Sequence, residues 1–145
     1  MLQLNAQPNL LPLNPAHDRR ATKRLDMAVI IPELAKYGGA ERFLIECVAR
    51  WQEWHDITIY SSVINADLLN EHGISKKVRL SRLSPYLSGQ HSILLNTALL
   101  PKIWEQEIGK HDVYHTHLWP THLIDLHPMV WFPHEPLRIL HDLRY

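Results

Sequence analysis

The sequence is poor in cysteine, in glycine and in long apolar runs, and it carries no net charge. Its single cysteine, Cys47, excludes a disulfide bond within the chain and is typical of proteins from a reducing compartment. Lysine plus arginine and aspartate plus glutamate number 15 each, so no overall field attracts nucleic acid, and we expect no nucleic-acid partner. No apolar run approaches the roughly 20 residues that cross a bilayer, and the first residues lack the features of a secretion signal. These absences predict a soluble protein of the cytoplasm.

The chain of 145 residues has room for one domain, preceded by a polar segment. Residues 1–26 contain three prolines and three asparagines and show no sustained hydrophobic period, which predicts a disordered tail. From residue 27, apolar runs alternate with helical patterns. We expect strands at residues 27–31, 57–60, 78–83, 113–115 and 129–132, and helices at 40–54, 66–72 and 93–108, the last interrupted or restarted at Pro101. Residues 27–145 are therefore predicted to form an α/β domain with a mostly parallel sheet flanked by helices.

A glycine pair, Gly38 and Gly39, lies between the first predicted strand and the first predicted helix. Ligands of parallel sheets bind beyond the carboxyl ends of the strands, and glycine lets a backbone approach an anion at a helix N-terminus. The pair is neither a P-loop nor the dinucleotide fingerprint, because the further residues of those motifs are missing. A plain turn at a helix start is the alternative interpretation. On the helix that follows, one side is apolar: Ala40, Phe43, Leu44, Cys47, Val48 and Trp51.

Histidines are concentrated late in the chain: seven of the eleven lie between residues 111 and 141. His115 and His117 are two residues apart, so on a strand they share one face. Imidazole is the commonest protein ligand for zinc, and a metal-dependent hydrolase is therefore one hypothesis. The alternative is that most of these histidines make ordinary structural hydrogen bonds.

Two further polar segments carry candidate functions. Pro133 and Pro136 hold the backbone around His134 and Glu135, just after the last predicted strand, and Arg138 has the planar fork that suits a phosphate or carboxylate. A surface turn with a local Glu–Arg contact would explain the same residues. A basic stretch is interpreted as a solvated face or as a surface for anionic lipid headgroups: Lys76, Lys77, Arg79 and Arg82.

Three motifs together resemble the N-terminal domain of a family 4 glycosyltransferase with the GT-B fold. They are Tyr-Gly-Gly-Ala-Glu-Arg at residues 37–42, Asp-Val-Tyr-His-Thr-His at 112–117, and Val-Trp-Phe-Pro-His-Glu-Pro-Leu-Arg at 130–138. The resemblance covers residues 27–145. It implies a Rossmann-like domain, the incomplete N-terminal half of a GT-B fold, and a retaining transfer of a hexosyl group from a sugar nucleotide without an obligatory metal or other cofactor.

The resemblance also implies roles for individual residues. Gly38 and Gly39 would meet the donor diphosphate through backbone amides. His117 would be the catalytic-site histidine that hydrogen-bonds the donor sugar near the reaction centre. His134, Glu135 and Arg138 would line the acceptor side of the cleft. The acceptor would be a glycan or a lipid-linked molecule, which allows a place at the cytoplasmic face of a membrane.

The sequence departs from this pattern in one large respect. A GT-B enzyme has a second Rossmann-like domain with most of the nucleotide contacts, and no such domain is found in these 145 residues. Two glycine amides and a helix dipole cannot by themselves neutralise a departing diphosphate. We expect a fragment that is inactive as a transferase on its own. The alternatives are a non-catalytic nucleotide-sugar-binding or regulatory remnant and, less favoured, the histidine-rich metal-dependent hydrolase.

Overall fold

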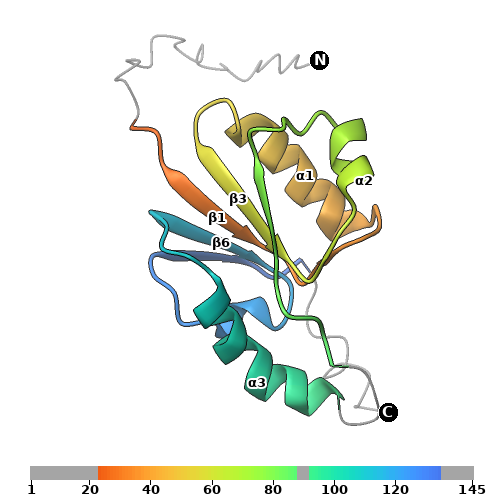
Figure 1. Cartoon of the computed structure of the whole chain (residues 1–145), viewed down its shortest axis with the longest axis vertical. Helices are drawn as coiled ribbons and strands as arrows, with labels where there is room; N and C mark the ends of the chain where they lie inside the picture. The colour runs from red at the N-terminus through yellow and green to blue at the C-terminus, as the bar shows by residue number, and fades with distance from the viewer. Residues whose placement is uncertain (1–22, 88–91, 135–145) are drawn as a thin grey trace, which may run out of the picture.

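The computed structural model describes residues 23–87 and 92–134. Its strands and helices alternate along the chain, as the sequence pattern predicts (Figure 1). The strands are β1 (Asp26–Ile30), β2 (Glu33–Leu34), β3 (Asp56–Ser61), β4 (Val63–Ile64), β5 (Arg79–Arg82), β6 (Val113–His117) and β7 (Met129–Phe132). The helices are α1 (Gly39–Trp51), α2 (Ala66–Glu71) and α3 (Ser92–Glu107), with a short 3-10 turn, η1 (Thr121–Leu123).

Five strands form one parallel sheet in the order β5-β3-β1-β6-β7. This confirms the predicted α/β class with a parallel, Rossmann-like sheet. The central strand β1 is buried on both faces, which explains its uninterrupted apolar sequence. The small parallel pair β2-β4 was not predicted, because two-residue strands leave no period in the sequence.

Helices cover both faces of the sheet and create two apolar cores. Val29 of β1 packs with Leu44 and Val48 of α1 in one core, whereas Ala28 and Ile30 of β1 pack against α3 in the other. Successive residues of a strand point to opposite faces, so one strand supplies both cores. Figure 1 shows α1 and α2 on one side of the sheet and α3 on the other.

Helix α1 is turned slightly from its predicted orientation. Its buried side chains are Leu44, Ile45 and Val48, whereas Phe43 is 37% exposed. Cys47 is only partly buried, and burial still raises the pKa of its thiol. The helix ends at Trp51 rather than at residue 54. Phe43 instead contacts Phe132 at the end of β7 and His134 beyond it.

The prediction of a break at Pro101 is wrong, because α3 runs without interruption from Ser92 to Glu107. Proline removes one backbone hydrogen bond from a helix interior. Pro101 is buried together with Leu100 and Trp104, and the packing of this inner face offsets the missing bond. No helix within the described ranges is long and apolar enough to cross a membrane.

The ends of the expected segments differ in detail. β1 begins at Asp26, inside the segment expected to be a tail, and Arg24 forms an ion pair with Asp56 at 2.8 Å. Residues 1–22 of that tail lie outside the described residues. In the basic stretch, Arg79 is engaged by Asp26 and by the Thr58 hydroxyl, at 2.8 Å each.

Candidate functional site

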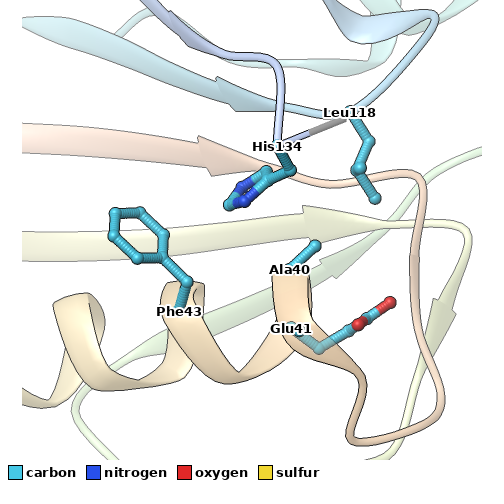
Figure 2. A pocket seen from close by; sticks show the side chains of 6 residues that line it. Ala40, Glu41, Phe43, Leu118 and His134 are labelled. Carbon is cyan, nitrogen blue, oxygen red and sulfur yellow. The ribbon is translucent and has the colours of Figure 1, made fainter. Parts of the chain in front are cut away.

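A cavity of about 540 Å³ opens at the carboxyl edge of the sheet (Figure 2). The N-terminus of α1, the residue after β6 and the second residue after β7 form its wall. The lining residues are Gly39, Ala40, Glu41, Phe43, Leu118 and His134. The first and third sequence motifs supply lining residues directly, and the second motif ends at His117, next to Leu118. Glu135 and Arg138 lie outside the described residues.

The two glycines at the start of α1 have different surroundings. A Cβ atom at Gly38 would lie 2.6 Å from a carboxylate oxygen of Glu41, whereas a Cβ at Gly39 would meet nothing within 4 Å. Gly38 is the N-cap in an extended conformation, with φ at −91°, so no left-handed backbone requires a glycine there. Gly38 thus leaves room for the Glu41 side chain, and Gly39 keeps the cavity open.

The described part of the cavity wall is acidic. Glu41 lies in the first turn of α1, where the helix dipole favours a carboxylate. A neighbouring cavity of about 240 Å³ shares Glu41 and Leu118 with the first and adds Glu33, Tyr86 and Trp119. Among the described residues that line the two cavities, the charged side chains are these two glutamates. A diphosphate bound here would need cations from residues other than these.

Three histidines form a hydrogen-bonded chain, which runs from the buried His115 through the buried His117 to His134 in the cavity wall. His115 Nδ1 lies 2.7 Å from His117 Nε2, and His117 Nδ1 lies 2.7 Å from His134 Nε2. The shared strand face of His115 and His117 is thus confirmed. His117 is fully buried and has both ring nitrogens engaged by other histidines, so His134 is the member that lines the cavity.

Packing fixes the rings of this chain. In the parallel register His117 pairs with Phe132, which brings His134 beside His117 from the neighbouring strand. Phe43 of α1 stacks on Phe132 with ring centroids 4.6 Å apart and meets the His134 ring edge-on at 5.2 Å. Trp51 packs against His115 at 4.8 Å. The Phe43 ring therefore packs against the His117 and His134 end of the three-histidine chain. The helical spacing of Phe43 alone did not predict this contact.

Burial keeps the three histidines neutral. It lowers the pKa of His117 to about 3, with further lowering from the charges that His115 and His134 would carry. Burial also lowers the pKa of His115 and of His134, and the Glu41 carboxylate opposes this shift at His134. Near neutral pH each ring therefore has one donor nitrogen and one acceptor nitrogen.

The histidine geometry is that of hydrogen bonding and not of metal binding. Two imidazole nitrogens on a tetrahedral zinc are about 3.3 Å apart, given zinc–nitrogen bonds of about 2.0–2.1 Å. The two contacts here are shorter, at 2.7 Å. Within residues 23–87 and 92–134, no three His, Cys, Asp or Glu side chains are grouped as metal ligands. The structure therefore adds no support for the metal-dependent hydrolase hypothesis.

Two cavity residues have an unusual backbone conformation. Leu118 has φ at 64° and His134 has φ at 56°, in the left-handed region that costs a non-glycine residue roughly 1–3 kcal/mol. The buried Thr121 hydroxyl lies 2.6 Å from the carbonyl oxygen of Leu118 and 2.9 Å from that of His117, and it holds this turn. Sequence reasoning missed Leu118, because leucine gives no signal for a left-handed turn. Such strain concentrates at functional sites.

Comparisons with protein-family models, with curated proteins and with solved structures found no match to this chain.

Proposed function

We propose that the chain is the N-terminal, Rossmann-like part of a retaining glycosyltransferase that uses a sugar nucleotide, and that the carboxyl-edge cavity takes part of the substrate. The observation that carries the proposal is the convergence of separate motifs on one cavity. Gly39 from the loop after β1, Leu118 directly after the histidine motif of β6, and His134 after β7 all line it. Ligand sites of parallel α/β sheets lie at this edge.

In this proposal each described residue has a distinct task. The open space at Gly39 lets a polar ligand approach the first amides of α1. His134 lines the cavity, and because its Nε2 is hydrogen-bonded to His117, Nδ1 is the ring nitrogen left for a ligand. His117, which the resemblance implies as the histidine nearest the donor sugar, would act through His134 unless the chain rearranges on binding. The acceptor is proposed to be a glycan or a lipid-linked molecule.

A second candidate is a nucleotide-sugar-binding module without catalysis. Two observations weigh against catalysis by these residues alone: the described wall of the cavity is acidic, and His117 is completely buried. Stabilising a departing diphosphate requires positive charge near the leaving group. A module of this kind would bind the nucleotide sugar weakly and leave its glycosidic bond intact.

Calorimetry with UDP-, GDP- and ADP-hexoses tests the shared part of both candidates. We expect weak but saturable binding, with a dissociation constant on the order of 1 mM or tighter, equal to about −4 kcal/mol of binding free energy. Free hexose at the same concentration is the control and should produce no saturable heat. A flat titration with all donors at several millimolar would contradict both candidates. Where binding is found, release of labelled hexose from the donor would favour the enzyme over the binding module, whereas absence of release fits both because the chain is expected to be inactive alone.

A further inference from the structure

The hydrogen bonds of the three-histidine chain must all run in one direction. A neutral imidazole has one N–H donor and one bare acceptor nitrogen. Both nitrogens of His117 are engaged, so His117 donates at one end and accepts at the other. The chain therefore has a direction, and only two directions are available.

The two directions give His134 opposite characters in the cavity. If His117 donates from Nε2 to His115, then His134 donates from Nε2 to His117 Nδ1, and His134 Nδ1 is a bare acceptor. If His115 donates from Nδ1 to His117, then His117 donates from Nδ1 to His134, and His134 Nδ1 carries a proton. A proton added at Nδ1 of His134 and released from Nε2 of His115 converts the first arrangement into the second without a change in charge.

We propose that His115, His117 and His134 act as one proton-sharing unit, in which His115 decides whether His134 presents a donor or an acceptor to the cavity. His115 is a positioning residue in this account. It is buried beside Trp51 and lies two rings away from the cavity. The inference rests on the proposed function only in taking the cavity as the ligand site.

The Glu41 carboxylate favours entry of a proton at His134. Among the described residues, Glu41 of α1 is the ionisable side chain outside the unit that acts on His134, and its carboxylate stabilises a proton there. The charges that act on His117 are those that its neighbours His115 and His134 would carry. A proton entering from the cavity would therefore be received at His134, the least buried member, and passed inward along two 2.7 Å contacts.

Nuclear magnetic resonance of isotope-labelled histidine ring nitrogens tests the proposal on the whole chain without any sugar nucleotide. In His115→Phe, which keeps an aromatic ring and removes the nitrogens, we expect the His134 ring-nitrogen signals to move between the ranges of protonated and bare nitrogen. His115→Asn, whose side-chain amide offers both a donor and an acceptor near the Nδ1 position, should restore them. His122→Phe is the matched control, because His122 packs on Trp131 and is not part of the three-histidine chain. It should leave the His134 ring-nitrogen signals unchanged.

Unchanged His134 signals in a folded His115→Phe protein would overturn the proposal. If that variant fails to fold, the parent protein provides the second measurement. During acidification the first proton taken up should move the ring-nitrogen signals of all three histidines in the same step, and a step that moves the signals of one ring alone would contradict a single unit. Because no donor substrate is used, failure here leaves the proposed function standing, and absence of nucleotide-sugar binding leaves this inference standing.

Discussion

Acidification from pH 7 to pH 5 is expected to lower the free energy of unfolding by about 2 kcal/mol through His117 alone, with further loss from His115 and His134 in the same direction. The folded state holds the pKa of His117 at about 3, against about 6.5 in an unfolded chain. As the pH falls below 6.5, His117 binds a proton in the unfolded state but stays neutral in the folded state. The stability that neutral His117 contributes is therefore fully present above pH 6.5 and is lost progressively as the pH falls towards 3.

Urea unfolding at a series of pH values measures this effect. His117→Phe should reduce the slope of stability against pH, because the variant no longer has the buried group that excludes a proton. Ile59→Val, a change in the apolar core, is the control. It should cost about 0.5–1.5 kcal/mol at every pH and leave the slope unaltered. A free energy of unfolding that is constant or rises between pH 7 and pH 5 would refute the burial of neutral histidines.

Replacing Trp104 by alanine is expected to cost about 3–5 kcal/mol, a large part of the stability of a small domain. Trp104 is fully buried between α3 and the sheet, and its indole N–H donates a hydrogen bond to the carbonyl oxygen of Ser84 at 2.9 Å. It also packs edge-on against Tyr86, a wall residue of the second cavity, at 5.7 Å. Loss of this side chain leaves a cavity in the core and removes the support of that wall.

Trp54→Ala is the matched control for this change. Trp54 is 61% exposed just beyond α1, and its removal should alter the free energy of unfolding by no more than about 0.5 kcal/mol. Thermal or urea unfolding of both variants and of the parent measures the loss of stability at each position. Equal effects at the two positions would show that Trp104 does not occupy the core as described.

The α/β class and the parallel sheet could be predicted because short apolar runs alternate along the chain with segments of helical period. The rotation of α1 could not, because Phe43 and Ile45 are both apolar and only their packing partners distinguish them. The α3 helix continues through Pro101 because burial of its inner face outweighs a local preference. Tertiary packing decided both cases.

The candidate site was predictable only in outline. Motifs at the ends of parallel strands indicate one edge of the sheet, and the cavity lies there. The contact between His117 and His134 depends on the β6–β7 register and on a left-handed backbone at His134, neither of which the sequence displays. The roles implied for Gly38, Gly39 and His117 stay predictions. Those for Glu135 and Arg138 concern residues outside the described ranges.

The central claim is that the carboxyl-edge cavity at the start of α1 binds a sugar nucleotide. The most direct test compares nucleotide-sugar affinity in the parent, in Gly39→Val and in Ala66→Val. A valine at Gly39 has free space and would project into the cavity, whereas Ala66 holds the same first helical position in α2, away from it. We expect Gly39→Val to weaken binding by about tenfold or more, equal to about 1.4 kcal/mol, at unchanged thermal stability, and Ala66→Val to bind as the parent does. Binding by Gly39→Val as tight as that of the parent would contradict the account.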